Sequence, residues 1–400
     1  MLIVGAGPAG AVAGLVLARA GVRVRIVDRA TFPRDKLCGD TLNPGTMARL
    51  RALGLAEEID RRGLRVDGMI LSGERGVVVD GGYPYGRFGR ALLRRELDAI
   101  LLQRAIAAGC AFDAGVPVRA ARVGETRGRR TVTGVSVGVN GAEQTVDAPV
   151  TIAADGRRST IAFGLGLARH PERPRRWAIG GYFEAAARYL GVHLRDISQM
   201  DGGRGTFGEM HVRRNCYIGV APVPGGLTNV CLVRPSGPAD HELADPASLL
   251  TRTLAADPVL RDRFCGARLV APPVVLGPLA VDVQTAAIPG LILAGDAAGF
   301  IDPMTGDGLR FAVHGGELAA QAAMHALEHG WQGVHARLDA ERRYAFGRKW
   351  RFNRALRTLV ASPRGVEAAA FGARIAPGVL RAVIARAGDC DLGTEGHGAG

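Results

Sequence analysis

Residues 2–30, LIVGAGPAGAVAGLVLARAGVRVRIVDRA, decide how this chain folds. Residues 2–4 are wholly apolar and predict a buried parallel strand, and residues 9–20 predict a helix of small and apolar residues. Residues 22–27 alternate apolar residues with arginine and predict a second strand, which ends at Asp28. Because the intervening glycines follow the spacing G-x-G-x-x-G, the stretch predicts a βαβ unit that binds a dinucleotide.

Each glycine of this turn has a physical task. Gly5 allows the tight turn, Gly7 lets the backbone approach a pyrophosphate, and Gly10 lets the helix pack on the strand. The helix N-terminus offers N–H groups and a partial positive charge to the phosphates. Asp28, eighteen residues after Gly10, can accept hydrogen bonds from ribose hydroxyls. The candidate cofactor-binding residues of this unit are Gly5, Ala6, Gly7, Pro8, Ala9, Gly10, Asp28 and Arg29.

Composition narrows the class of protein. The chain has 400 residues, of which 47% are hydrophobic and 22% charged, so we expect two domains or one large discontinuous one. The net charge is +13, but the arginines are scattered with little aromatic interleaving, so we expect no nucleic-acid partner. The six cysteines include no C-x-x-C pair, which argues against a metal site and a disulfide framework and favours a reducing compartment.

The apolar start of the chain could be mistaken for a signal peptide. It lacks a basic segment at its front, and its glycines fall where a nucleotide-binding loop requires them. No stretch reaches ~18 uninterrupted apolar residues, so we expect a cytoplasmic protein without a membrane span. Because the first strand begins at the initiator methionine, an upstream start codon is a hypothesis that mass spectrometry of the native protein can refute.

Two distant motifs repeat the pattern of a strand followed by a turn and a helix. In residues 148–166, APVTIAADGRRSTIAFGLG, a predicted strand runs into Asp155-Gly156. In residues 290–327, another predicted strand runs into Gly295-Asp296, and a loop then leads into an alanine-rich helix. Each motif alone is a common turn, so the evidence lies in finding all three in one chain.

The three motifs, in this order and spacing, resemble the glutathione-reductase-type FAD fold. Within it they resemble the branch shared by class A flavin monooxygenases, flavin halogenases and geranylgeranyl reductases, over roughly residues 1–330. The resemblance implies an α/β fold: an FAD-binding Rossmann-like domain with a parallel sheet, a mostly antiparallel substrate sheet, and C-terminal helices. It implies FAD as cofactor and NAD(P)H as the reductant.

The resemblance also assigns roles to the two later motifs. Asp296 would bind the ribityl chain, Asp155-Gly156 would lie near the pyrophosphate, and the loop after Asp296 would wrap the pyrimidine side of the flavin. A helix that begins at Gly308 would direct N–H donors and its positive end toward the charge of the reduced ring. The implied cofactor-binding residues are Asp155, Gly156, Gly295, Asp296, Pro303, Gly306, Asp307, Gly308 and Leu309.

Two weaker signals agree with this family. Residues 94–105, RRELDAILLQRA, resemble a family helix whose arginine reaches the FAD, here Arg94, although a solvated helix arginine fits the same pattern. Residues 117–123, PVRAARV, correspond to the strand that pairs with adenine, so Val118 is a candidate.

Residues 32–45, FPRDKLCGDTLNPG, hold Lys36, one of only two lysines in the chain. The segment is similar to the P-R-x-K-x-C-G pattern of geranylgeranyl and related prenyl reductases, including menaquinone-reducing relatives. In those proteins it crosses beside the isoalloxazine and the phosphates, which implies that Lys36, Cys38 and Gly39 contact FAD. Cys38 is a candidate redox or proton-donating thiol, or else a small residue that packs against the flavin.

The resemblance is imperfect in residues 216–233, CYIGVAPVPGGLTNVCLV. The prenyl reductases have an aromatic lid there, Y-x-W-x-F-P, over the substrate. Tyr217 is present, but Gly219 and Ala221 stand at the tryptophan and phenylalanine positions. Losing two aromatic side chains of ~150–250 Å2 each predicts a wider pocket or a bulkier substrate. Tyr217 joins Cys38 as a catalytic candidate, and no acid or base is assigned.

The predicted FAD-binding domain is discontinuous and consists of residues 1–62, 90–165 and 281–330. Residues 63–89 and 166–280 form the predicted substrate domain. His211 and Arg213 are polar candidates on its substrate side, although a structural role fits each of them better than a catalytic one. Residues 331–388 predict a helical cap, whose arginine-rich helix could instead lie on a membrane surface, and 389–400 predict a disordered tail.

These features together predict an FAD-dependent oxidoreductase. Reduced nicotinamide or another donor would supply electrons, and a C=C or quinoid bond of an apolar, prenyl- or polyketide-like substrate would accept them. A monooxygenase that uses O2 is the alternative, because it has the same fold and cofactor. A third hypothesis is a flavoprotein that modifies RNA. Such a protein requires a basic surface, and its affinity for RNA would decrease with salt concentration.

Overall fold

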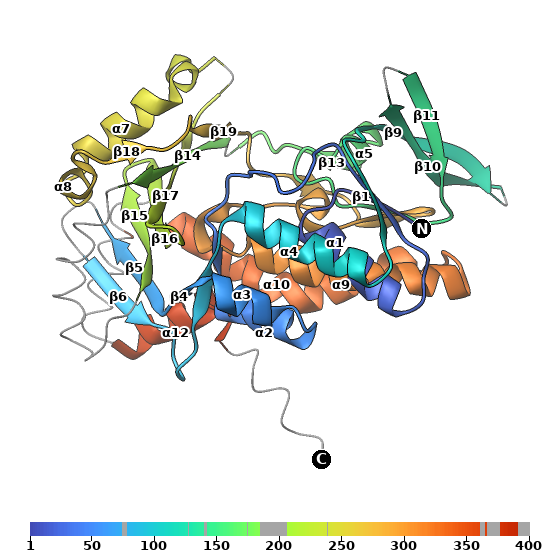
Figure 1. The fold of residues 1–400 in the computed structure, drawn as a ribbon, viewed down its shortest axis with the longest axis horizontal. Helices are drawn as coiled ribbons and strands as arrows, with labels where there is room; N and C mark the ends of the chain where they lie inside the picture. The colour runs from blue at the N-terminus through green and yellow to red at the C-terminus, as the bar shows by residue number, and fades with distance from the viewer. Residues whose placement is uncertain are drawn as a thin grey trace.

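The computed structural model describes residues 1–73, 78–126, 128–139, 142–173, 175–184, 206–237, 239–360, 365 and 377–390. Two large sheets dominate these residues, and helices lie beside both (Figure 1). One sheet is almost entirely parallel and the other mostly antiparallel, so the predicted fold class is confirmed. The predicted domain boundaries stay a prediction.

The first sheet has six strands in the order β21-β22-β12-β1-β2-β8. All neighbours are parallel except the edge strand β21, which runs antiparallel to β22. The strands are β1 (Leu2–Val4), β2 (Arg25–Asp28), β8 (Ala111–Ala114), β12 (Thr151–Ala153), β21 (Ala287–Ile288) and β22 (Leu291–Leu293). The three motifs therefore end three adjacent parallel strands, β1, β12 and β22.

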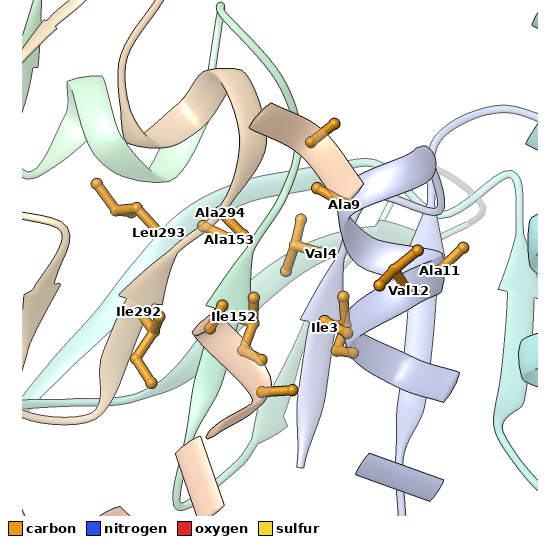
Figure 2. Packing of buried hydrophobic residues seen from close by; sticks show 14 of the residues in the cluster. Ile3, Val4, Ala9, Ala11, Val12, Ile152, Ala153, Ile292, Leu293 and Ala294 are labelled. Carbon is orange, nitrogen blue, oxygen red and sulfur yellow. The ribbon is translucent and has the colours of Figure 1, made fainter. Parts of the chain in front are cut away.

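The core of this domain is built from the middle residues of those strands. Ile3 pairs with Ile152, and Ile152 with Ile292, and all three are fully buried. Figure 2 shows them in one row, with Ala9 and Val12 of the first helix beside β1. Continuous apolar strands of this kind are expected where both faces of a parallel sheet are covered.

Four long helices pack around this sheet. They are α1 (Pro8–Arg19), α4 (Arg94–Ala107), α9 (Gly308–His329) and α10 (Val334–Val360). Helix α1 packs against both α4 and α9, and α10 packs against α9. Small residues allow the close approach: a Cβ on Gly316 of α9 would lie 2.5 Å from the Ala9 carbonyl oxygen of α1.

The second sheet has eight strands, in the order β18-β14-β17-β16-β15-β5-β6 with β19 also paired to β14. Its strands are β5 (Gly68–Ser72), β6 (Val78–Gly82), β14 (Arg176–Glu184), β15 (Phe207–Arg213), β16 (Cys216–Val223), β17 (Leu227–Pro235), β18 (Arg268–Leu269) and β19 (Val274–Leu276). The pairing is antiparallel except between β5 and β15. Helices α7 (Pro246–Ala256) and α8 (Arg261–Phe264) cover one face, where Phe183 and Leu232 pack against Leu250 and Phe264.

Smaller elements complete the fold. Three small sheets are formed by β9 (Val118–Thr126), β10 (Arg129–Val139) and β11 (Ala142–Asp147); by β3 (Thr41–Leu42), β4 (Leu64–Val66) and β7 (Gly89–Ala91); and by β13 (Ala168–Arg169) and β20 (Asp282–Val283). The shorter helices are α2 (Pro44–Ala52), α3 (Ala56–Arg62), α5 (Thr160–Gly164), α12 (Pro377–Ala387), and the 3-10 turns η1 (His241–Ala244), η2 (Gly295–Ala298) and η3 (Pro303–Thr305). In none of the residues described above is a helix long and apolar enough to cross a membrane.

The C-terminal end corrects one prediction. The disordered tail was expected to begin at residue 389, but Asp389 and Cys390 are buried. Asp389 pairs with Arg310 of α9 at 2.7 Å and with Lys349 of α10 at 3.4 Å, so two buried cations fix it in place. The remainder of the predicted tail, residues 391–400, lies outside the described residues.

Candidate active site

The three sequence motifs meet at one edge of the parallel sheet. Gly5 follows β1, Asp155 follows β12 shortly after its end, and Gly295 follows β22, and these strands are neighbours. The carboxyl ends of parallel strands, next to a helix N-terminus, are where nucleotides bind in folds of this kind. The fold therefore brings together residues that are nearly 300 positions apart in the sequence.

Some of the predicted glycines are needed because protein atoms crowd them. A Cβ on Gly10 would lie 1.9 Å from the Gly5 carbonyl oxygen, and one on Gly5 would lie 2.5 Å from the Ala154 carbonyl oxygen. On Gly295 it would lie 2.8 Å from the Cβ of Ala9. These three glycines let α1, β1 and the loop after β22 touch, so their role is in the packing of the fold.

Other predicted glycines face open space. A Cβ on Gly39, Gly156, Gly306 or Gly308 would have no neighbour closer than 3.6 Å, and one on Gly7 would meet only the Arg34 side chain, at 3.4 Å. Gly156 and Gly306 have φ of +85° and +68°, a backbone that itself favours glycine, whereas neither crowding nor a positive φ explains Gly7, Gly39 and Gly308. Those three positions fit a cradle in which a ligand lies against the backbone. This arrangement is what a bound FAD would need from the chain.

Asp28 is placed beside the glycine turn. Its carboxylate accepts hydrogen bonds from the Ala6 N–H at 2.8 Å and the Ala30 N–H at 2.9 Å. Each oxygen keeps a second lone pair for a ribose hydroxyl. The Val116 N–H donates to the Asp28 carbonyl oxygen at 2.8 Å, which brings the start of β9, with Val118 as its first residue, next to Asp28. Arg29, the next residue, is exposed.

Lys36 lies between two of the motifs. Its Nζ is 3.9 Å from where a Cβ on Gly156 would be, and it is exposed to solvent. Surrounding protein and the cations Arg94 and Arg34 lower its pKa, while Asp296 and Asp98 act in the opposite direction. The charge of Asp296, which follows β22, therefore acts on the Lys36 ammonium.

Two arginines that the sequence analysis did not select add positive charge here. Arg34 lies against Gly7 and forms an ion pair with Asp98 at 3.2 Å. Burial and Arg158 lower the pKa of Arg157 to about 10, and Asp296 opposes that shift. With Lys36, these cations suit a pyrophosphate. The available signal was that Arg157 directly follows Gly156 and that Arg34 stands two residues before Lys36.

Arg94 has its guanidinium committed to a protein partner. It is buried and binds both oxygens of Asp98, each at 2.8 Å. Burial alone would lower its pKa, but Asp98 and Cys38 raise it well above the usual range. A direct contact from Arg94 to FAD stays a prediction. In the structure, Arg94 holds the Asp98 carboxylate in the position where it also pairs with Arg34.

A buried polar network surrounds Cys38, and the sequence analysis missed its central residue. The Asp40 carboxylate accepts hydrogen bonds from the Tyr182 hydroxyl at 2.6 Å, the Asn229 amide at 2.5 Å and the Arg94 N–H at 3.2 Å. Asn229 also donates to the Cys38 carbonyl oxygen at 2.6 Å. The network joins the Lys36–Asp40 segment to β14 and β17 of the second sheet.

The catalytic candidate Tyr217 is also engaged. Its hydroxyl donates to Asp302 at 2.5 Å, and Arg176 binds the other oxygen of Asp302 at 3.2 Å. Burial and the Asp302 charge raise the pKa of Tyr217 well above its usual value. A phenol held in this way is a poor proton donor to substrate, so its clearest task is to anchor the loop that contains Asp302.

The face of the second sheet that looks toward Cys38 is lined by small residues. Leu37 packs directly on Gly180, since a Cβ there would lie 2.6 Å from the leucine side chain. A Cβ on Gly219 would have no neighbour closer than 3.9 Å, so there is room above it. His211 is on the opposite face, bound to Ser72 and Glu209, and Arg213 binds Asp257. These two residues are therefore corrected from substrate-side candidates to structural ones.

The flavin loop is tied to the C-terminal helices. The buried Asp307 carboxylate accepts from Asn43 at 3.2 Å and Asn353 at 3.0 Å, and it pairs with Lys349 at 3.1 Å. Helix α9 begins at the next residue; Asp307 is its N-cap and makes no side-chain capping hydrogen bond, and the first turn contains no acidic side chain. The backbone N–H groups of this turn, near Gly308, remain the expected flavin contact.

The residues present fit FAD. Open glycines lie at the ends of β1 and β12 and in the loop before α9, and cations lie beside Gly7 and Gly156. The first turns of α1 and α9 contain no acidic side chain. No group of His, Cys, Asp and Glu side chains among the described residues could hold a metal ion. The FAD contacts of individual residues stay predictions.

Comparisons with known proteins agree with this site. Residues 1–188 match the sequence model of an FAD binding domain. The chain is 33% identical over 339 residues to the menaquinone reductase of Mycobacterium tuberculosis, covering 80% of this chain and 75% of that protein. It is 27% identical over 342 residues to the digeranylgeranylglycerophospholipid reductase of Methanosarcina mazei, covering 82% and 76%.

The fold also matches solved flavoproteins. The flavin-dependent halogenase CmlS superposes with a TM-score of 0.75 at 26% identity, covering 88% of this chain and 63% of the halogenase, so this chain spans less than two thirds of that protein. The chain is an FAD-dependent oxidoreductase and belongs to the geranylgeranyl reductase-like branch of the FAD-binding oxidoreductases, the branch that includes menaquinone reductase.

Proposed function

We propose that this enzyme reduces a C=C or quinoid bond of an apolar, prenyl- or polyketide-like small molecule. The observation that carries the proposal is the composition of the sheet face beside Cys38: Ala178, Gly180, Gly219, Ala221 and Met210 are apolar. The polar side chains next to them are bound to one another and not free for a polar substrate. Bound FAD would supply hydride acceptance and donation.

The names of the relatives support the same reaction class. Menaquinone reductase and digeranylgeranylglycerophospholipid reductase both carry names that describe reduction of long apolar molecules. The space above Gly219 suits a substrate bulkier than a single prenyl chain, because no aromatic side chain occupies that position. A quinone with an apolar side chain combines these properties.

The electron donor is proposed to be NADPH or NADH. Anaerobic bleaching of the bound flavin absorbance by each nucleotide tests this directly. Bleaching by one and not the other identifies the donor. Bleaching by dithionite alone would point to a protein or other donor.

A hydroxylase is the second candidate, and the halogenase CmlS, which shares the fold, favours it. The two reactions differ in their use of O2. The deciding experiment incubates the holoenzyme with menaquinone and reductant under argon. Mass spectrometry showing a product with two added hydrogen atoms supports the reductase. A product that forms only in air and carries an added oxygen atom would overturn it.

We further propose peripheral contact with anionic membranes through α10. Its buried side holds Phe346 and Lys349, and its exposed side carries Arg343, Arg348, Arg351 and Arg354. None of these four arginines has an ion-pair partner among the residues that the structure describes. Such a stripe is attracted to anionic headgroups by about 1 kcal/mol per residue. Co-sedimentation with anionic vesicles, lost in neutral ones and in an Arg348→Ala/Arg351→Ala variant, tests it.

A further inference from the structure

Asp40 is a buried carboxylate to which the proposed reaction assigns no task. It is fully buried, it directly follows Cys38-Gly39, and its backbone has a positive φ of 53°. A buried charge and a left-handed backbone at a non-glycine residue are both unfavourable. Sites that keep such features are more often functional than structural.

The contacts of Asp40 come from three different elements. Its Oδ1 accepts from the backbone of Arg94, where α4 begins, and its Oδ2 accepts from Tyr182 of β14 and Asn229 of β17. Asn229 divides its amide between Asp40 and the carbonyl oxygen of Cys38. The side chain therefore fixes the backbone on both sides of Gly39 to the second sheet.

We propose that Asp40 is a positioning residue for the reaction, and that its side-chain oxygens hold Cys38 and Gly39 in place. The consequence for catalysis rests on the proposed function, in which this segment faces the flavin. The mechanism follows from the partners. All three are donors, so replacing one carboxyl oxygen with an amide NH2 group, which cannot accept, leaves at least one of them without an acceptor.

The ionisable groups around Asp40 are the Arg94 guanidinium, the Tyr182 phenol and the thiols of Cys38 and Cys231. Burial raises the pKa of Asp40 to about 6, although Tyr182, Asn229 and Arg94 oppose the shift. Burial, followed by the charges of Cys38 and Asp40, raises the pKa of Cys231 to about 12, so it stays a neutral thiol. Because the raised pKa of Asp40 means that the folded arrangement favours the protonated carboxyl, ionisation weakens the hold on the segment as the pH rises through about 6.

The first test measures how firmly the segment is held, without cofactor or substrate. FAD-free protein at neutral pH is treated with N-ethylmaleimide, and labelling of Cys38 is followed by peptide mass spectrometry with the exposed Cys265 as internal reference. Asp40→Asn should speed Cys38 labelling at least about fivefold relative to Cys265, because the segment then opens more often. Unchanged labelling would overturn the proposal.

A matched control separates positioning from general loss of stability. Asp257 is also a buried carboxylate, bound by Arg213 at 2.6 and 3.0 Å, on the side of the sheet away from Cys38. Asp257→Asn should leave the ratio of Cys38 to Cys265 labelling unchanged. An equal increase in both variants would show that Asp40 acts only through the stability of the fold.

The second test uses pH. FAD affinity of the wild type, measured by flavin fluorescence, should weaken as the pH rises through about 6, and Asp40→Asn should lack this step. Tyr182→Phe keeps the carboxylate and removes one donor, so the step should move to higher pH. This variant also serves if Asp40→Asn fails to fold. A step that is identical in all three proteins would overturn the proposal. A reductase assay that fails while the labelling result holds would overturn the proposed function alone.

Discussion

At the scale of single residues, the two sets of glycines separate folding from cofactor binding. Gly10 is crowded by the Gly5 carbonyl oxygen, whereas Gly7 meets only a flexible arginine side chain. Gly7 also has φ −69° and ψ −178°, a backbone that alanine adopts without strain. The same substitution at positions three residues apart should therefore have different effects.

Gly10→Ala is expected to destabilise the fold by about 3 kcal/mol or to prevent folding, because the new methyl overlaps backbone that cannot move away. Gly7→Ala is expected to change the free energy of unfolding by less than about 1 kcal/mol and to weaken FAD binding at least tenfold. Urea unfolding and FAD titration of both variants check this. Equal stability losses with equal FAD affinity would contradict it.

Asp40 predicts a dependence of stability on pH with a definite sign. Its folded pKa is raised from 3.8 to about 6, so its stabilising contribution is complete below pH 3.8 and is lost as the pH rises through 6. The loss corresponds to about 3 kcal/mol. Relative to Asp40→Asn, the wild type should therefore lose stability between pH 4.5 and 7, as measured by urea unfolding. A difference between the two proteins that does not vary with pH would contradict this assignment.

Contacts between single residues were also the part of the structure that the sequence predicted least well. Asp40 is 142 positions from Tyr182 and 189 positions from Asn229 in the sequence. The three residues meet only in the folded protein. No local pattern could show that the aspartate after Cys38-Gly39 is buried. Cys38 was chosen from a motif, whereas the residues that hold it are visible only in three dimensions.

At the scale of elements, the most informative contact joins the flavin loop to the C-terminal helices. The Lys349 Nζ of α10 donates to the carbonyl oxygens of Arg386 and Ala387, at the end of α12, at 2.6 and 2.8 Å. It also pairs with Asp307, which precedes α9. The second lysine of the chain is thus as specifically placed as the first, and no sequence pattern indicated its role.

Lys349→Met is expected to destabilise the protein by about 3–5 kcal/mol, because it leaves Asp307 and Asp389 buried without a shared cation. Cleavage near the C-terminus by a protease should become faster, since α12 loses its cap. Arg351→Met, on the exposed side of the same helix, should change stability by less than about 0.5 kcal/mol. Similar unfolding midpoints for the two variants would show that Lys349 does not hold α12 in place.

The elements of the FAD-binding part were predicted well because each carries its own local signal. The strand at residues 2–4, the helix after it and the strands before Asp155 and Gly295 all appear within a few residues of where the sequence placed them. Apolar runs that end in glycine turns are a short-range property. The face of the sheet on which His211 and Arg213 lie could not be predicted, because it depends on the register between strands.

At the scale of the whole molecule, the second sheet contacts the segment that carries Lys36 and Cys38, because Asn229 donates to the Cys38 carbonyl oxygen and Leu37 packs on Gly180. One sheet edge with open glycines and cations is the expected place for the cofactor, and one sheet face with small apolar residues lies beside the same segment. The order of motifs along the chain predicted the first part. The sheet face on the substrate side was predicted only from the family resemblance. Because Gly219 and Ala221 replace the aromatic residues of the family's lid, the identity of the substrate stays a proposal.

The site draws on distant parts of the chain, so FAD should stabilise the whole fold. At a free concentration of a hundred times its dissociation constant, a ligand that binds only the folded state adds about 2.7 kcal/mol. Removing FAD should therefore lower the unfolding midpoint, and adding it back should restore the midpoint. Adenosine diphosphate should restore part of the effect, because it reaches the glycine turn and Asp28 but not the loop before α9. An unfolding midpoint that does not change when FAD is removed or added would contradict the expected FAD-binding site.

The central claim is that the enzyme passes electrons from flavin to an apolar unsaturated substrate. The most direct test is a rapid-mixing absorbance measurement on anaerobically reduced holoenzyme, mixed in one arm with menaquinone and in the other with oxygenated buffer. If the enzyme is a reductase, we expect the oxidised flavin spectrum to return fast with menaquinone and slowly with oxygen. Fast reoxidation by oxygen that is coupled to hydroxylation of added substrate, with no response to menaquinone, would contradict it.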